Sequence, residues 1–196
     1  MKHDTIPALR QALQDAPPTA EAHLRLGNAL LASGAVREAE RELRAAIGLD
    51  PKCAGAWVNL GGILFSRWEF GAAIQANRSA AAADPTLVIA HFNQAIGHLQ
   101  LGEPESALAC LTRVVELEPG NGGAYYHLGI ALHALDRHSE AELCVAYADE
   151  LGYRPNAVSA EALKLAAAGG AKESHSESEV PPSSAQGEPH GTAQRG

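Results

Sequence analysis

Two asparagines, Asn59 and Asn93, are the residues whose type and spacing most clearly suggest binding chemistry. Other residue types recur along the chain at the interval that separates positions 59 and 93, which we call the repeat interval. A carboxamide can both donate to and accept from the backbone of an extended peptide, and a second carboxamide one repeat interval further on would repeat that contact. Arg25 and His127 stand one repeat interval before and after the pair. The alternative is that the asparagines only satisfy neighbouring polar groups or water.

The other reactive residue types show no pattern typical of catalysis. Serine and histidine occur without a nucleophile, a base and an orienting group at suggestive spacing, and there is no phosphate-binding loop. His127 and His133 are six residues apart without carboxylate or thiolate companions at ligand spacing, so no metal site and no cofactor are predicted. Cys110 and Cys144, one repeat interval apart, are predicted to be packing residues. The sequence therefore predicts a protein that is not an enzyme.

The elements that position these residues also recur at the repeat interval. Residues 57–85 contain Gly61, then Ala73 twelve residues later, and they end at Pro85. Small residues recur at equivalent positions elsewhere, namely Gly27, Ala39, Ala95, Ala107, Gly129 and Ala141. Two antiparallel helices can approach closely only where both side chains are small, and a proline ends the second helix because it lacks an N–H. The spacing therefore predicts a pair of helices in each period.

The aromatic residue, the Leu-Gly pair, the alanines and the closing proline resemble the tetratricopeptide repeat signature. The resemblance covers four gapless units, residues 20–53, 54–87, 88–121 and 122–155. It implies an all-α, right-handed α-α superhelical solenoid, because a single helix pair cannot bury its apolar stripe and must stack on the next. In the second unit Trp68 occupies the turn and Asn77 replaces a large apolar residue. These two departures predict that the second helix of this unit is the most weakly anchored.

The segments outside the four units are predicted to close the stack. Residues 1–19 contain an N-terminal capping helix, or half-repeat, with Leu9 on its apolar face. Residues 156–168 form a C-terminal capping helix, which an open solenoid requires. Residues 169–196 contain Val180 as their only large aliphatic residue, so they cannot offset the entropy of ordering and are predicted to be a disordered tail.

In the family that the sequence resembles, the first helix of each unit lines the concave side, and this implies a peptide-binding groove. Its predicted residues are Arg25, Asn28, Asn59, Phe65, Phe92, Asn93, Ile96, Tyr126, His127 and Ile130. Members of the family that clamp a C-terminal carboxylate use Lys and Arg at places held here by Leu24, Ile89 and Asn93, so that mode is disfavoured. The apolar groove residues leave open a second mode, in which the groove receives an amphipathic helix.

Length and charge limit the class of partner. The chain has 196 residues, a net charge of −8 and 15 basic against 23 acidic residues. No basic face is evident, so nucleic acid and anionic membrane surfaces are not the predicted partners. The N-terminus has no uninterrupted apolar run, so neither a secretory signal nor membrane insertion is predicted. A cytoplasmic location follows as the expectation.

The sequence thus predicts a non-enzymatic adaptor or scaffold that binds a peptide segment of a partner protein in a concave groove. The alternative is a self-assembling structural module. In that case the groove would accept the N-terminal helix or the tail of a neighbouring copy, and the chain would form a homo-oligomer.

Overall fold

The computed structural model of the chain describes residues 5–155, and within this range it consists of helices without strands. The helices are α1 (Ile6–Asp15), α2 (Ala20–Ala32), α3 (Val36–Leu49), α4 (Ala54–Ser66), α5 (Phe70–Ala83), α6 (Val88–Gln100), α7 (Pro104–Leu117), α8 (Gly122–Ala134) and α9 (His138–Glu150). None of the helices in residues 5–155 combines the length and apolar character needed to cross a bilayer. The all-α prediction is confirmed.

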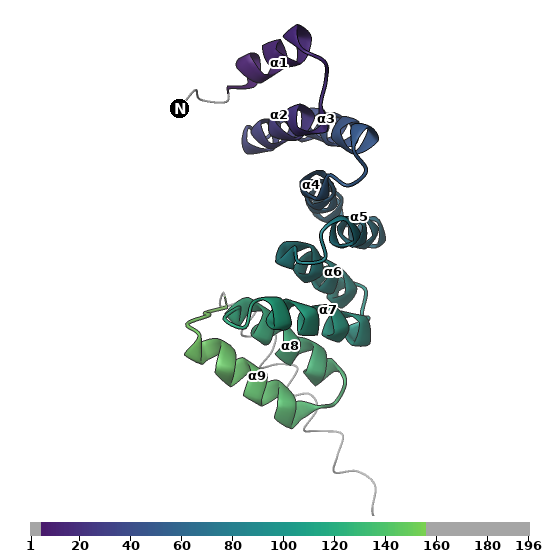
Figure 1. Ribbon diagram of the computed structural model, residues 1–196. Helices are drawn as coiled ribbons and strands as arrows, with labels where there is room; N and C mark the ends of the chain where they lie inside the picture. The colour runs from purple at the N-terminus through teal and green to yellow at the C-terminus, as the bar shows by residue number, and fades with distance from the viewer. Residues whose placement is uncertain (1–4, 156–196) are drawn as a thin grey trace, which may run out of the picture. The chain divides into compact units, whose positions relative to one another are not determined.

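The helices pack as consecutive antiparallel pairs, as Figure 1 shows. α2 packs on α3, α4 on α5, α6 on α7 and α8 on α9, and each pair also packs on the next. α1 packs on α2 at the N-terminal end of the stack. This is the predicted solenoid of helix pairs. The helix predicted for residues 156–168 and the tail predicted for residues 169–196 lie outside the described residues.

Small residues allow the two helices of a pair to approach closely. A Cβ atom added to Gly61 in α4 would lie 3.4 Å from the carbonyl oxygen of Ala73 in α5 and 2.3 Å from the amide nitrogen of Asn77. A Cβ added to Gly129 in α8 would lie 3.1 Å from the carbonyl oxygen of Ala141 in α9. The 2.3 Å distance at Gly61 and the 3.1 Å distance at Gly129 are shorter than ordinary contacts of a Cβ atom, which is the reason for glycine at these helix crossings.

The turn inside each helix pair has the same backbone geometry. One residue in each turn is left-handed, and these are Gly34 (φ 79°), Trp68 (φ 64°), Gly102 (φ 70°) and Asp136 (φ 57°). In the second unit the N–H of Glu69 donates to the carbonyl oxygen of Leu64 at 3.0 Å, and the N–H of Trp68 donates to Phe65 at 2.9 Å. This is the hydrogen-bond pattern of a Schellman motif, which requires a left-handed residue after the helix. Trp68 therefore adopts a backbone conformation that favours glycine.

Helix α5 is anchored more firmly than its sequence suggests. Asn77 is 1% exposed, and its amide nitrogen donates to the carbonyl oxygen of Ala73 at 2.9 Å. The amide of Gln94 in α6 donates to the backbone oxygen of Asn77 at 3.3 Å. A buried polar group costs little when its hydrogen bonds are made. Asn77 thus joins α5 to α6, contrary to the weak anchoring expected for this helix.

A partly buried ionic contact connects the first two helix pairs. The carboxylate of Glu40 in α3 accepts a hydrogen bond at 2.5 Å from Arg67, which follows the end of α4. Arg44 contacts the same carboxylate from one turn further along α3. The hydrogen bond from Arg67 holds the pKa of Glu40 below its ordinary value, because it stabilises the charged form. Glu40 therefore fixes the turn of the second unit against the first.

Candidate peptide-binding surface

The first helices of the pairs form a continuous row. In addition to its partner within the pair, α4 contacts both α2 and α6, and α6 contacts α8. The second helices make no comparably extensive contacts with one another in residues 5–155. Successive first helices therefore lie closer to one another than successive second helices do. The exposed side that the first helices share carries the predicted groove residues, and we call it the inner face.

An asparagine pair bridges the first two helices of this row. The amide nitrogen of Asn59 in α4 donates to the side-chain oxygen of Asn28 in α2 at 2.5 Å. The two residues were predicted to face a ligand from neighbouring units, and the structure brings them into contact. A carboxamide has two N–H groups and an acceptor oxygen, so one shared hydrogen bond leaves each residue with further bonding capacity. The pair thus presents oriented amide groups on the inner face.

Asn93 has a different environment from Asn59. Its amide nitrogen donates at 3.3 Å to the side-chain oxygen of Asn77, which belongs to the neighbouring second helix α5. Asn59 and Asn93 are both half-buried, but the partner of Asn59 is the exposed Asn28, whereas the partner of Asn93 is the buried Asn77. Although Asn59 and Asn93 are one repeat interval apart, they therefore do not present equivalent amides. Asn93 resembles the alternative in which an asparagine satisfies a neighbouring polar group.

Aromatic rings occupy the inner face further along the row. The ring of Phe92 in α6 meets the ring of His127 in α8 edge to face, with 5.5 Å between ring centroids. Tyr126 is only 2% exposed and lies beside Tyr153, at 5.4 Å between centroids. The expectation that Tyr126 faces a ligand does not agree with this burial, because its ring packs against Tyr153, which follows α9. Phe92 and His127 remain half-buried at the surface.

Burial also sets the protonation of His127. Desolvation lowers its pKa from 6.5 to about 4, because the surrounding rings cannot solvate a charged imidazole. Its Nδ1 atom is buried without a hydrogen-bond partner among the described residues. His127 is therefore a neutral ring that contributes an apolar edge to the inner face at neutral pH.

The other predicted groove residues differ in how far they are exposed. Arg25 is exposed, and Ile96 and Ile130 are half-buried. Phe65 packs edge to face against Phe70 of α5 at 5.0 Å, so part of its ring is used within its own helix pair. The exposed polar contacts thus lie on α2 and α4, and the apolar part of the inner face lies on α6 and α8.

Gly62 leaves an opening next to the asparagine pair. It is exposed in the middle of α4, and a Cβ atom added to it would meet no atom within 4 Å. It occupies the same place in its unit as Asn28, Ile96 and Ile130. The inner face therefore has space above α4, immediately beside oriented amide groups.

Comparison with known proteins agrees with the repeated geometry. The tetratricopeptide repeat family matches residues 4–42, 24–87 and 92–155. The chain belongs to this family. A search of curated proteins gave no match.

Solved structures with the same repeat architecture are similar over most of the described chain. A crystal structure of MamA is 26% identical, with a TM-score of 0.70, and the match covers 75% of this chain and 86% of that one. A second MamA crystal structure is 27% identical with a TM-score of 0.68, covering 74% and 80% of the two chains. MamA residues 41-end from Desulfovibrio magneticus RS-1 match at 20% identity and a TM-score of 0.68, covering 75% and 83%. That last likeness concerns the fold alone.

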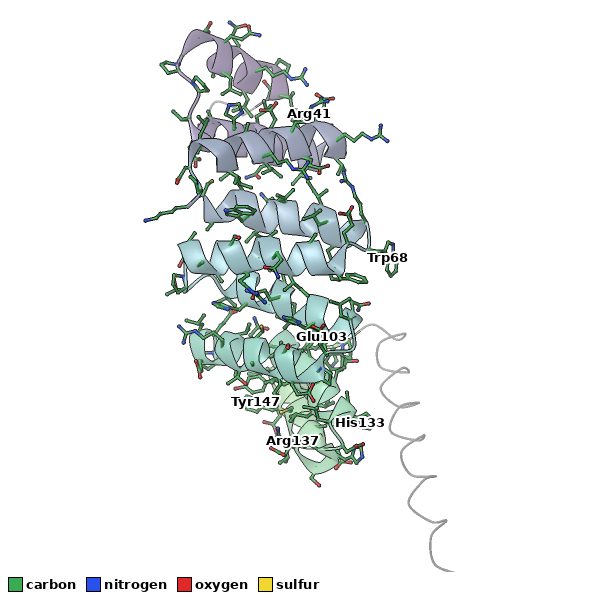
Figure 2. All side chains as sticks on the ribbon, turned by 90° about the vertical axis from the view of Figure 1, so that its right-hand side faces the viewer. Arg41, Trp68, Glu103, His133, Arg137 and Tyr147 are labelled. Atoms are coloured by element: carbon green, nitrogen blue, oxygen red, sulfur yellow. The ribbon has the colours of Figure 1, made fainter. Side chains whose placement is uncertain are left out.

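The tetratricopeptide repeats also contain residues whose environment the sequence did not predict. Trp68, 77% exposed, projects from the turn of the second repeat, as Figure 2 shows. His133 and His138 meet across the turn of the fourth repeat. Their five-residue separation across a helix turn was the only available signal. Within residues 5–155 no group of three or more His, Cys, Asp or Glu residues could hold a metal ion.

The cysteines of the third and fourth repeats are half-buried and free. Cys110 and Cys144 both pack against the apolar cluster around Leu111 and Val114. Burial raises the pKa of both thiols, because the thiolate is poorly solvated there. This environment favours the unreactive thiol form, which is the expected state of a packing residue.

Proposed function

We propose that this chain is a non-enzymatic interaction module that holds an extended segment of a partner protein on its inner face. The observation that supports the proposal most directly is the exposed Asn28–Asn59 pair beside the open space at Gly62. Amide groups that are already oriented can bind a peptide backbone without a further loss of side-chain entropy. Membership of the tetratricopeptide repeat family supports a role in protein–protein interaction. The Asn28–Asn59 pair supports a binding site on the inner face.

The extended mode is better supported than a bound helix. An amphipathic helix would need a wide apolar groove. Phe65 and Phe92 already make ring contacts within the chain, and Tyr126 is buried. The apolar surface left on α6 and α8 suits one or two ligand side chains next to a backbone held by Asn28 and Asn59.

A leucine at position 62 tests the site directly. Gly62→Leu fills the space above α4 without a clash in the fold, because a Cβ there meets no atom within 4 Å. Gly71→Leu is the matched control, because Gly71 is also helical and open but belongs to the second helix α5. Proteins crosslinked to the parent chain in its native cell are identified by mass spectrometry, and direct binding to the purified partner is then measured for each variant.

We expect Gly62→Leu and Asn59→Ala each to weaken partner binding at least tenfold, whereas Gly71→Leu binds as the parent does. The tenfold change corresponds to about 1.4 kcal/mol of binding free energy. Asn93→Ala is expected to have a smaller effect than Asn59→Ala, because Asn93 is bonded to Asn77. Equal binding by the parent and Gly62→Leu would rule out the inner face as the site.

A second candidate function is self-assembly into a structural homo-oligomer. Leu143 and Tyr147 in α9, and Leu151 directly after it, recur at four-residue spacing, with exposures of 71%, 42% and 37%. This spacing places them on one side of the helix. Light scattering over a range of concentrations tests the idea, with Leu143→Glu as the variant expected to keep the chain monomeric. A parent chain that is itself monomeric at every concentration excludes it.

Two finer expectations stay predictions. The absence of nucleic-acid binding rests on the acidic composition, and the cytoplasmic location is a default expectation.

A further inference from the structure

Two imidazole rings converge at the turn of the fourth repeat. His133 lies in the last turn of α8, and His138 is the first residue of α9. Their Nδ1 atoms are 3.1 Å apart, and the ring centroids are 4.7 Å apart. The side chain of His138 is 49% exposed, so solvent reaches the pair. Figure 2 shows His133 at the edge of the helix stack.

The distance between the two nitrogens matches the requirement for shared metal binding. Zinc–imidazole bonds are about 2.0–2.1 Å long, so two nitrogens 3.1 Å apart subtend an angle of roughly 100° at an ion. This angle lies between those of square-planar and tetrahedral coordination. A shared proton also explains the contact, but it uses one donor and one acceptor, whereas an ion would engage the lone pairs of both nitrogens.

The carboxylate of Asp136 supports this role from the other side of one ring. Its Oδ1 atom lies 3.8 Å from Nε2 of His138, the nitrogen that points away from His133. At this distance, and with the Asp136 side chain 96% exposed, the negative charge favours a proton on Nε2 only weakly, and that tautomer leaves Nδ1 free as a ligand. The left-handed backbone at Asp136 (φ 57°) belongs to the turn that brings both histidines together.

Other histidines of the stack contact oxygen acceptors instead. His23 contacts Glu42 at 2.7 Å, His98 contacts Glu103 at 2.6 Å, and His91 contacts the backbone oxygen of Pro85 at 3.0 Å. In those pairs the ring nitrogen donates to an oxygen. The contact between His133 and His138 therefore differs in kind, because two potential metal ligands face each other.

We propose that His133 and His138 chelate a late first-row divalent transition ion through their Nδ1 atoms. Imidazole ligands suit copper, nickel and zinc, and affinity is expected to be highest for Cu²⁺. Because no third His, Cys, Asp or Glu completes a cluster in residues 5–155, water fills the remaining coordination positions. Mg²⁺ and Ca²⁺ prefer oxygen ligands and are not expected to bind here.

Calorimetric titration of the full chain with CuCl₂, NiCl₂, ZnCl₂ and MgCl₂ tests the proposal. We expect saturable binding of the first three ions that depends on His133 and His138, tightest for Cu²⁺, and no heat of binding for Mg²⁺. His133→Ala and His138→Ala should each weaken that site at least tenfold, and the double variant should lose it. His91→Ala is the matched control and should leave the site unchanged.

Electron paramagnetic resonance of the Cu²⁺-loaded chain gives a second measurement, in which two coordinated imidazole nitrogens are expected in the parent chain. Circular dichroism shows whether the His133→Ala, His138→Ala and double variants keep the helix content of the parent chain. Loss of the site together with retained helix content supports the proposal. If Cu²⁺ binds the His133→Ala and His138→Ala variants as tightly as the parent, or if the parent binds none, the proposal is overturned.

Discussion

His127 shows how burial alone can make one residue sensitive to pH. Its pKa lies at about 4 instead of the ordinary 6.5, because the folded chain cannot solvate the charged ring. Below about pH 6.5 the unfolded chain binds a proton that the folded chain does not bind. The folded state therefore loses stability relative to the unfolded state as the pH falls from 6.5 towards 4.

The variant His127→Phe is expected to remove this pH dependence. Phenylalanine keeps a ring against Phe92 but binds no proton and has no unpaired Nδ1 atom. The stability gained over the parent should therefore grow by roughly 1–2 kcal/mol between pH 7 and pH 5. Urea denaturation at several pH values measures it, with His91→Phe as the control. A difference that is constant across this range would contradict the assignment to His127.

The asparagines show what the sequence could and could not predict for single residues. The repeat interval identifies Asn59 and Asn93 as equivalent positions in neighbouring repeats. Their hydrogen bonds differ because Asn28 faces one and Asn77 faces the other. Asn77 stands where the repeat pattern of the second helices has an apolar residue. The pattern therefore could not predict the hydrogen bond that Asn77 accepts from Asn93.

At the scale of one helix, two adjacent glycines of α4 have opposite surroundings. Gly61 faces α5, where an added Cβ would lie 2.3 Å from the side chain of Asn77. Gly62 faces open space, where an added Cβ meets nothing within 4 Å. The same substitution at the two positions should therefore have opposite effects on stability.

Gly61→Ala is expected to destabilise the fold by about 1–3 kcal/mol, because the new methyl group forces Asn77 away from its hydrogen bonds. Gly62→Ala is expected to stabilise it by about 0.5–1 kcal/mol, because alanine loses less backbone entropy than glycine in a helix. Urea denaturation of both variants measures the two changes. Effects of the same sign would show that the packing at this helix crossing differs from the one described.

The helices themselves were largely predictable, since each repeat supplies its own helix-ending signals. Asp84 illustrates one such signal, because its carboxylate accepts hydrogen bonds from the backbone and hydroxyl groups of Thr86 in the turn that follows α5. The left-handed conformation of Trp68 was not evident from its residue type. The hydrogen bonds of the helix end impose that conformation whatever residue occupies the position.

At the scale of the whole stack, each repeat contacts mainly the repeats next to it. Stability in such an array is approximately a sum over repeats and their interfaces, and the ends open more easily than the middle. Helix α1 lies at one end and contributes a single buried residue, Leu9, to a cluster with Leu26 and Leu30.

Leu9→Ala should therefore release α1 without unfolding the central repeats. The lost packing is worth about 2–5 kcal/mol, which exceeds what a single ten-residue helix can supply by itself. Hydrogen exchange followed by mass spectrometry should show faster exchange in residues 6–15 and unchanged exchange in α4 to α7. Leu111→Ala, in the interior of the stack, is the contrasting variant and should raise exchange across several helices. A uniform increase caused by Leu9→Ala would indicate a fully cooperative chain.

The side chain of Trp68 is an intrinsic fluorescent probe of the turn in the second repeat. The chain has two tryptophans, and the other one, Trp57, is half-buried with its indole N–H bonded to the backbone oxygen of Pro51 at 2.9 Å. Trp68 is 77% exposed, so dissolved iodide quenches its fluorescence more readily than that of Trp57. Replacement of Trp57 by phenylalanine leaves Trp68, at the turn of the second repeat, as the single tryptophan. A molecule that binds over this turn then shifts the emission wavelength of Trp68 and reduces its quenching by iodide, so no attached dye is needed.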